Sequence, residues 1–585
     1  MSGGAESPTP GADGPSSASP SGRWLPRLIA AGSIALIALV GWWPSLGLWF
    51  PEADTLALVD TARLEGVGGF LELWTSRLLE GTGFPADYYR PVSSLSFALD
   101  FSLWGLDPFG YQLTNLLLHT AVALSVGQLV LLVAGESSDR ARAEPGWPAQ
   151  AAAWGAALVL LFHPLAAEVV PSPARRQDLL ATLFLVGTLG LAGGLFLGSG
   201  EPSKRRLVGG WFCWALALGS KEIAFVGAPV LVLLGWWSHR RGEWGRRPWI
   251  HTTAAGGFAA IFLVFLAART AVLGGLGGEV GGAPGLVDGF WAATEYVASW
   301  IHPSAALIAG LPDHVALPAG LLTTALGVWV WARFARFGKR ERVPGASVYA
   351  LGLVITGLAL AAGPMIRASY LDAVHRAGVE GTPASGIRLG SAPTSYISLV
   401  DWHWGVTTAA MVAVTFISAG SILCWRRLRI AGPWKGAAIL TLLAPGGIYA
   451  LARNYSVWGG YIALVPIALL VGCLLLSAGR QWAERADGRE AGTGFSKLVH
   501  RLSAVGLGAL LAITPALHGL EGWSTASELT RRGLAEIRSF AEAQPPRSGS
   551  LTVVGFPTAQ SAHFGRPTVS QLTMAPKSYT VRSYL

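Results

Sequence analysis

Four groups of ionisable residues lie at the ends of long apolar segments in this chain of 585 residues. Charge at the edge of a bilayer is costly unless it is paired or hydrated, so each group is a functional candidate. The groups are Glu52 with Asp54; His163 and Glu168 with Arg176 and Asp178; Ser220, Lys221 and Glu222; and Arg453 with Asn454 and Tyr455. The topology described below places all four at extracytoplasmic helix ends, as a single membrane-surface cleft requires. They predict the reaction face of a membrane enzyme, with Asp54 as its principal carboxylate.

The segment 49–110 would carry most of this face, because it separates the first two long apolar segments and is rich in acidic residues. Its acidic residues include Glu52, Asp54, Asp60, Asp87, Asp100 and Asp107. Connections in compact proteins are usually far shorter than this one. We therefore expect loop 51–110 to have a function, and its amphipathic part, 61–79, to lie along the membrane interface.

The composition is that of a helical protein embedded in a membrane. Hydrophobic residues make up 52% of the chain and charged residues 13%, about half the charged fraction of soluble proteins. The 75 Gly and 25 Trp fit close helix packing and interfacial anchoring. The net charge of +9 is expected to reflect cytoplasmic loops, so we predict no nucleic-acid partner. The three cysteines form no CxxC motif and are expected to fill apolar cores.

About thirteen transmembrane helices are predicted, so the fold class is an all-α polytopic membrane protein. The expected segments are 28–50, 111–134, 148–162, 178–197, 207–218, 225–237, 251–273, 316–331, 346–364, 404–425, 433–451, 461–476 and 502–517. Lys and Arg gather in alternate loops, as the positive-inside rule requires of cytoplasmic loops. This alternation places the N-terminus in the cytoplasm and the C-terminus outside it, in a bacterial inner or plasma membrane.

Three domains follow from this pattern. Residues 1–22, rich in Ser, Pro, Gly and Ala, predict a disordered cytoplasmic tail. Residues 23–518 form the transmembrane domain, with extracytoplasmic loops 51–110, 274–313 and 365–403. Residues 519–585 form an extracytoplasmic segment, in which a capping box at Thr525 and Glu528 and a short strand at 551–554 predict a small α/β appendage.

Structural explanations compete with a functional one at most of these positions. Arg176 and Asp178 could pair with each other at a helix start, where Asp also favours the positive dipole end. Lys221 and Glu222 could form an interfacial salt bridge. A histidine in the position of His163 is more often packed and hydrogen-bonded than a ligand.

The carboxylates of the first loop have similar alternatives. Asp54 could be a solvated loop residue, and Asp87, Asp100 and Asp107 are expected to be turn or cap residues. The histidines show no metal-ligand spacing. The sequence therefore requires no cofactor and leaves a divalent metal open.

Three ordered stretches carry a family resemblance. They are YYRPVSSLSFALDFSLWGLDPFGYQLTNLLLH at 88–119, LFHPLAAEVVPSPARRQDLLATLF at 161–184 and ALGSKEIAFVGAPVLVL at 217–233. They resemble the C-type glycosyltransferase superfamily, and within it the integral-membrane O-mannosyltransferases that carry tetratricopeptide repeats in eukaryotes. The resemblance covers about residues 28 to 240. Two features depart from it: the usual double acidic pair of the first loop is Ala53-Asp54 here, and the repeats are absent.

The resemblance implies a C-type fold and an inverting enzyme that uses a polyprenyl-phosphate-linked sugar donor. The sugar would pass to a hydroxyl of a protein, lipid or glycan acceptor on the extracytoplasmic face. Asp54 would be the general base, with Glu52 as the second candidate. An already ionised phosphate leaving group needs cations more than a general acid.

The resemblance also suggests roles for the remaining candidates. Arg176, Lys221 and Arg453 would hold the phosphate. Glu168 and Asp178 would orient these cations, and Arg90 would steady the helix of Asp54. His163 and Glu222 complete the predicted substrate-binding set.

A different class of protein remains open at this point. A secondary transporter or lipid flippase also has many helices with charges near the midplane of the membrane. In this sequence the candidate charges gather at one face and the first outside loop is large, which favours the enzyme. The sequence names neither the sugar, the acceptor nor the carrier length.

Overall fold

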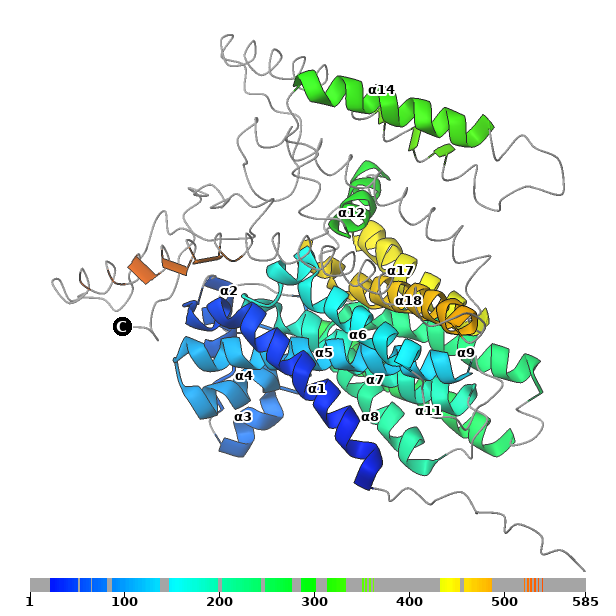
Figure 1. Cartoon of the computed structure of the whole chain (residues 1–585). Helices are drawn as coiled ribbons and strands as arrows, with labels where there is room; N and C mark the ends of the chain where they lie inside the picture. Colours follow the sequence, from blue (N-terminus) through cyan, green and yellow to red (C-terminus); the bar gives the residue numbers. More distant parts are fainter. Residues whose placement is uncertain are drawn as a thin grey trace, which may run out of the picture.

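A computed structural model describes most of the N-terminal half of the chain and selected parts of the rest (Figure 1). The described residues are 21–50, 53–64, 66–80, 87–136, 147–197, 203–242, 248–275, 286–300, 313–332, 432–452 and 457–486, with single positions within 350–361 and 520–539. Every element among them is an α-helix or a 3₁₀-helix. The all-α prediction is therefore confirmed for this part of the chain.

The α-helices have clear bounds. They are α1 (Ser21–Trp42), α2 (Ala53–Thr61), α3 (Gly66–Glu72), α4 (Pro91–Trp104), α5 (Pro108–Glu136), α6 (Trp147–Phe162), α7 (Arg176–Phe196), α8 (Lys204–Ser220), α9 (Gly227–Arg240), α11 (Pro248–Leu273), α12 (Leu286–Ser299), α14 (Asp313–Val330), α17 (Gly432–Ala452) and α18 (Leu464–Ala486). The 3₁₀-helices are η1 (Trp43–Gly47), η2 (Pro164–Glu168), η3 (Pro173–Arg175), η4 (Glu222–Val226) and η6 (Val457–Ala463).

Seven described helical segments are long and apolar enough to cross a membrane. They are Leu28–Gly47, Pro108–Gly135, Pro173–Phe196, Glu222–Arg240, Pro248–Leu273, Pro433–Ala452 and Gly459–Leu476. Two shorter apolar helices, Pro148–Phe162 and Leu317–Val330, match further predicted segments. The count of thirteen remains a prediction, because 404–425, 502–517 and most of 346–364 lie outside the described residues, as does the strand predicted at 551–554.

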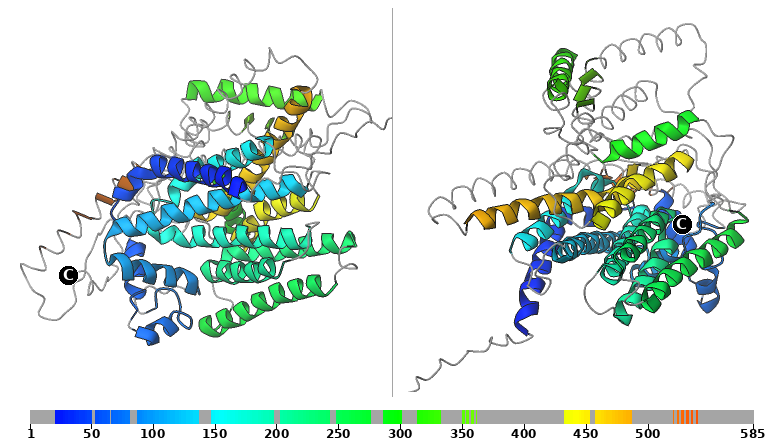
Figure 2. Two further views of the ribbon diagram at one scale, coloured as in Figure 1. Left: turned by 60° about the horizontal axis from the view of Figure 1, so that its bottom comes forward. Right: turned by 90° about the vertical axis from the view of Figure 1, so that its right-hand side faces the viewer.

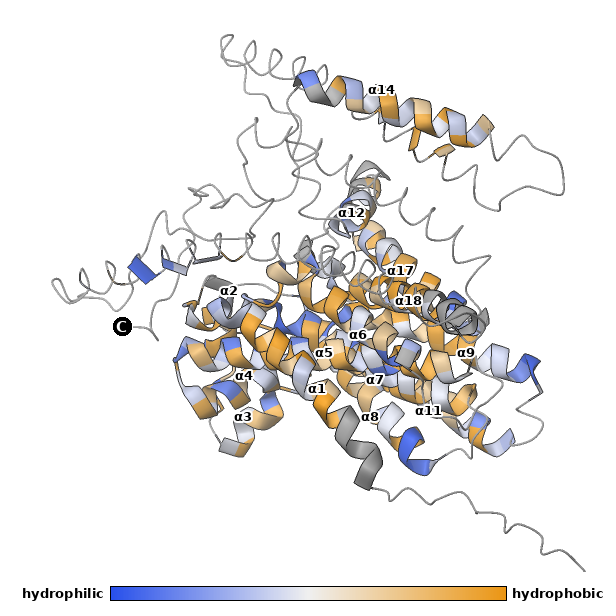
Figure 3. Ribbon diagram, viewed as in Figure 1, coloured by the Kyte–Doolittle hydropathy of each residue, from blue (hydrophilic) through white to orange (hydrophobic). Residues whose placement is uncertain are grey.

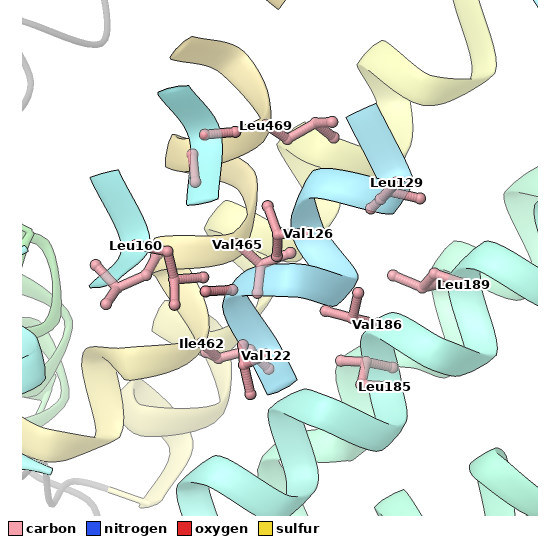
Figure 4. Close-up of a cluster of buried hydrophobic side chains, with 14 of the residues drawn as sticks. Val122, Val126, Leu129, Leu160, Leu185, Val186, Leu189, Ile462, Val465 and Leu469 are labelled. Carbon is pink, nitrogen blue, oxygen red and sulfur yellow. The ribbon is translucent and has the colours of Figure 1, made fainter. Parts of the chain in front are cut away.

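The core lies where α5 packs between α6, α7 and α18. Figure 4 shows Val126 of α5 between Leu160 and Val465 on one side and Val186 on the other. Close approach depends on small residues: a Cβ on Gly472 of α18 would lie 2.8 Å from Cγ2 of Val130. Glycine permits this spacing because it removes the side chain that would keep two helices apart.

Helices α2, α3 and α4 gather at one end of this bundle, which we call the α4 end (Figures 1 and 2). Gly219, in the last turn of α8, lies so close to Val92 of α4 that an added Cβ would be 2.7 Å from it. Arg77 donates hydrogen bonds to the carbonyl oxygens of Val272 and Leu273 at the end of α11 (3.4 and 3.1 Å). The loop 51–110 is thus a packed cap on the bundle where the structure describes it.

The opposite end of the bundle carries hydrophilic helix termini. Figure 3 shows orange, apolar middle parts of the helices and blue residues at the start of α8 and the end of α9. These residues include Lys204, Arg205, Arg240 and Arg241. These four of the positive charges that the sequence assigned to cytoplasmic loops therefore lie away from the α4 end.

One local prediction at the C-terminal segment is wrong. The capping box at Thr525 and Glu528 predicted a helix start there, but Leu520 and Trp523 are already helical. Glu528 instead pairs with the following Arg531 and Arg532 (2.9 and 2.8 Å), because residues three and four apart share a helix face.

Candidate active site

The first turn of α2 contains Asp54 and lies beside the start of α7. Thr55 is fully buried, and its Oγ1 accepts a hydrogen bond from the backbone N–H of Ala174 (3.2 Å). Leu58 and Val59 pack into a cluster that also contains Ala174. The structure thus brings the Asp54 position to the N-terminal end of α7, although the side chain of Asp54 lies outside the described residues, as do Glu52 and Arg453.

Arg176, the first residue of α7, is enclosed by acceptors from α4 and α5. Its Nη2 lies 2.6 Å from a carboxylate oxygen of Asp100, and its Nε donates to Asn115 Oδ1 (2.9 Å). Its remaining bonds go to the carbonyl oxygens of Tyr111 (3.1 Å) and Ser96 (3.3 Å). The guanidinium has no exposed surface, so these contacts join three helices.

These contacts change two interpretations of the sequence. Asp100, expected to be a turn or cap residue, is a buried ion-pair partner that also accepts a hydrogen bond from Thr114 Oγ1 (2.8 Å). Arg176 pairs with Asp100 rather than with Asp178, the partner considered from the sequence. Sequence proximity suggested the wrong pair, because helix packing brings Asp100 to the first turn of α7.

Asp178 pairs with Lys221, at the junction of α8 and η4. Lys221 Nζ lies 2.6 and 2.7 Å from the two carboxylate oxygens, and both residues are buried. Burial lowers the pKa of Lys221 from its usual range, a shift that the Asp178 carboxylate opposes. Asp178 thus holds the Lys221 ammonium group, while the role of this pair toward a phosphate stays a prediction.

Glu222 binds two arginines from different parts of the chain. Its Oε2 accepts from Arg90 Nε (2.9 Å) and Nη2 (2.6 Å), and its Oε1 accepts from Arg269 Nη1 (2.8 Å). Arg90 also donates to Gln177 Oε1 (2.7 Å) and lies 4.1 Å from the ring centre of Tyr88. Arg90 therefore joins the segment before α4 to α7 and η4. The predicted role of Arg90, steadying the helix of Asp54, stays a prediction.

Arg269 was missed in the sequence analysis. It lies in the last turns of the apolar helix α11 and is buried. An isolated arginine within a membrane-length apolar segment is itself a signal of a functional or paired position. That signal was present in the sequence, but no local motif indicated Glu222 as its partner.

Together these residues form a buried network, which we call the Glu222 network, of Arg90, Asp178, Lys221, Glu222 and Arg269. Three cations and two carboxylates leave one formal positive charge. The Glu222 side chain is the most exposed of the five, at 19%. Excess positive charge in a partly desolvated site attracts an anionic group.

His163 and Glu168 flank η2, at the same end of the bundle. His163 Nε2 donates to the carbonyl oxygen of Trp300 (2.7 Å), and its Nδ1 accepts from the N–H of Leu165 (3.2 Å). Burial lowers the pKa of His163 to about 4, so its imidazole is neutral near pH 7. His163 is thus the packed, hydrogen-bonded histidine considered from the sequence. Glu168 is buried at the end of η2.

Among the residues that the structure describes, no three His, Cys, Asp or Glu side chains come together in a way that could hold an ion. The chemistry available from the described groups is that of carboxylates, guanidinium groups and one ammonium group.

Comparison with known proteins identifies relatives over part of the chain. Protein O-mannosyl-transferase Tmtc3 of Drosophila melanogaster is 35% identical over 112 residues, which are 18% of this chain and 12% of that protein. The human protein O-mannosyl-transferases TMTC4 and TMTC2 are 29% and 32% identical over 164 and 101 residues, which are 27% and 17% of this chain. The matched stretches span only 22% and 10% of these two human relatives.

No family model matches the chain, and no solved structure matches it. The curated relatives nevertheless confirm the resemblance to the O-mannosyltransferase branch of the C-type glycosyltransferases.

Proposed function

We propose that this chain, a relative of protein O-mannosyl-transferases, is a membrane glycosyltransferase that moves a sugar from a polyprenyl-phosphate carrier to a hydroxyl acceptor on the extracytoplasmic face. The acceptor class is a protein or a glycolipid, and the enzyme works among membrane lipids in a bacterial inner or plasma membrane. The relatives support the transferase class. The donor, the acceptor and the orientation are parts of the proposal.

The observation that carries the proposal is the Glu222 network at the α4 end. Its one excess positive charge lies at the end of the bundle where the chain also brings the start of α2, which contains Asp54. A sugar phosphate ester placed there would meet guanidinium and ammonium groups at its anionic end. Cations held in advance by carboxylates need little reorganisation when charge develops on a leaving phosphate.

The reaction then needs one base. As the acceptor oxygen attacks the anomeric carbon, a new C–O bond forms while the bond from that carbon to the phosphate oxygen breaks. The phosphate leaves with the bonding electron pair, and the acceptor proton passes to the carboxylate of Asp54. Attack from the face opposite the phosphate inverts the anomeric configuration.

The geometry supports a different division of roles among the cations from the one suggested by the resemblance. Arg176 has no exposed surface and meets protein acceptors from Asp100, Asn115, Tyr111 and Ser96, so we assign it to the architecture of the cap. Arg90 and Lys221 are also paired, but 8% and 11% of their side-chain surfaces stay exposed. The phosphate ligands in this proposal are Arg90, Lys221 and Arg269. Arg453 remains a predicted fourth cation.

An assay of Asp54→Asn tests the proposal. Purified full-length protein in liposomes is given a polyprenyl-phosphate donor with a radiolabelled sugar, and both sugar release and transfer are measured. We expect donor binding to persist and transfer to fall by about 10²–10⁴-fold, the usual share of general-base catalysis. Asp60→Asn, on the same helix and partly exposed, is the matched control and should keep the parental rate.

The companion variant Glu52→Gln separates the possible failures. It should cost less activity than Asp54→Asn. An inactive Glu52→Gln beside an active Asp54→Asn would move the base to Glu52 and leave the enzyme class standing. Normal transfer by both variants would show that this segment is not the reaction face. Failure of the parent to use any such donor would favour the transporter or flippase class.

A further inference from the structure

The C-terminal helix contacts both the segment before Asp54 and the turn that ends at Glu168. Its described residues are helical from Leu520 onward, and Trp523 and Ser527 lie four residues apart on one face. Both are buried, whereas Arg531 and Arg532 are exposed. Figures 1 and 2 show the orange fragments of this helix beside α2 and the end of α1.

Trp523 holds the turn that precedes Glu168. Its indole Nε1 donates to the carbonyl oxygen of Ala167 in η2 (2.6 Å), and its ring packs on Leu48. At 1% exposure, Trp523 is among the largest fully buried side chains of the described residues. The backbone next to Glu168 is therefore fixed by a residue more than three hundred and fifty positions away in the chain.

Ser527 holds the backbone at Trp49, just after η1 and five residues before Asp54. The chain leaves η1 at Leu48 in an extended conformation (φ −75°, ψ 135°), so the next N–H has no helical acceptor. Ser527 Oγ accepts a hydrogen bond from this N–H, that of Trp49, at 2.7 Å. On the other side of Asp54, Thr55 is held by Ala174. The position of Asp54 thus lies between two anchored points.

We infer that the C-terminal helix is a clamp that positions the Asp54 segment against the His163–Glu168 turn, with Trp523 and Ser527 as its positioning residues. This inference rests on the proposed function, because it assigns the clamp to the rate of that reaction. Both hydrogen bonds go to backbone atoms of the two segments, so they set where the segments lie. Small displacements of a reacting group have large effects on rate.

Kinetics of Ser527→Ala and Trp523→Phe test the positioning role. Each change removes one hydrogen-bonding group and keeps most of the packing. We expect kcat per folded enzyme to fall by about 10–100-fold, with the KM for the donor little changed. Ser527→Thr, which keeps the hydroxyl, should restore most of the rate, and Arg532→Ala, on the exposed face of the same helix, should keep the parental rate.

Thermal unfolding and the yield of monodisperse protein, measured for each variant, separate positioning from simple loss of the fold. A variant with a parental kcat per folded molecule and a lower yield would assign Trp523 and Ser527 to stability alone and overturn the inference. A fall in kcat with an unchanged unfolding midpoint supports it.

A crosslinking experiment tests the docking without any assay of activity. Leu48→Cys and Trp523→Cys are introduced into full-length protein whose Cys213, Cys424 and Cys473 are replaced by Ser, and a short bis-maleimide is added in native membranes. We expect an intramolecular crosslink for this pair and none for Leu48→Cys with Arg532→Cys. Absence of the first crosslink, when the parental protein transfers sugar, would overturn the clamp and leave the proposed function intact. Failure of the parental protein to transfer sugar, when the crosslink forms, would overturn the function, and the positioning role with it.

Discussion

Single residues at the α4 end are distinguished by how completely the protein satisfies them. Arg176 of α7 is enclosed and bonded to groups of α4 and α5, while the Glu222 side chain, between Arg90 and Arg269, keeps some exposed surface. A buried charge that loses its partner is strongly destabilising, because the remaining charge has neither water nor a counter-ion. A cation that serves a substrate must instead exchange a protein contact for a substrate contact. The Arg176–Asp100 pair and the cations of the Glu222 network should therefore respond differently to mutation.

Arg176→Ala and Asp100→Ala should each destabilise the fold by about 3–5 kcal/mol, as expected for breaking a buried ion pair. The double variant Arg176→Met/Asp100→Leu should be more stable than either single variant, because it leaves no unpaired charge. Unfolding midpoints in detergent, followed by tryptophan fluorescence, measure the difference. Lys221→Arg is the contrasting change and should act mainly on donor use. An Arg176→Ala protein of parental stability and reduced donor affinity would return Arg176 to the phosphate site.

At the scale of elements, the break between α8 and η4 distributes two adjacent charges to different partners. Lys221 has an extended backbone (φ −163°, ψ 147°) between the two helices. The extended residue Lys221 breaks the helical path, so that Lys221 reaches Asp178 while Glu222, the first residue of η4, reaches the two arginines. The salt bridge between neighbours that the sequence allowed is thereby avoided. This arrangement needs the last turn of α8 to lie against α4.

Gly219 should set the distance between the last turn of α8 and α4. A Cβ there would lie 2.7 Å from Val92 Cγ2, and a β-branched valine cannot easily turn away. We expect Gly219→Val to destabilise the protein by about 1–3 kcal/mol through overpacking, and to weaken donor binding by shifting Arg90, two residues before Val92. Gly256→Ala, on α11 with open space around its Cβ, is the control and should be neutral or slightly stabilising. Equal unfolding midpoints for Gly219→Val and the parent would show that α8 and α4 are not in close contact.

At the scale of the whole molecule, the arginines at the end of α9 and the candidate active site lie at opposite ends of the bundle. Arg240 and Arg241 end α9 on the far side from α2, α3 and α4. The C-terminal helix lies at the α4 end, because Ser527 bonds to Trp49 and Trp523 bonds to Ala167. If the positive-inside rule orients the molecule, the network and the C-terminal helix are both outside the cytoplasm.

Reporter fusions can check this orientation. A fusion at Gly242 should report a cytoplasmic position, and a fusion at Gly66 an extracytoplasmic one. A fusion after Ser539 should agree with Gly66, since the helix before it contacts the α4 end. Cysteine labelling from outside the cell, at the same three positions, is an independent measurement. Opposite results for Gly66 and Ser539 would separate the clamp from the reaction face.

Local patterns in the sequence determined the helical class and the position of many elements. Apolar runs of membrane length predicted α5, α7 and α11 near their observed bounds, because run length and side-chain hydropathy are properties of a single segment. Predictions that depend on short polar signals were weaker. The capping box at Thr525 and Glu528 did not mark the helix start, since Leu520 and the buried Trp523 before it are already helical.

The tertiary structure alone decided the partners of the charged residues. Arg176 with Asp100, Glu222 with Arg269 and Trp523 with Ala167 each join segments between 47 and 356 residues apart. The sequence places a charge in a helix, but the energy of that charge depends on which groups surround it after packing. Only the approach of α4, α7, α8 and α11 brings those groups together, and no local pattern encodes that approach.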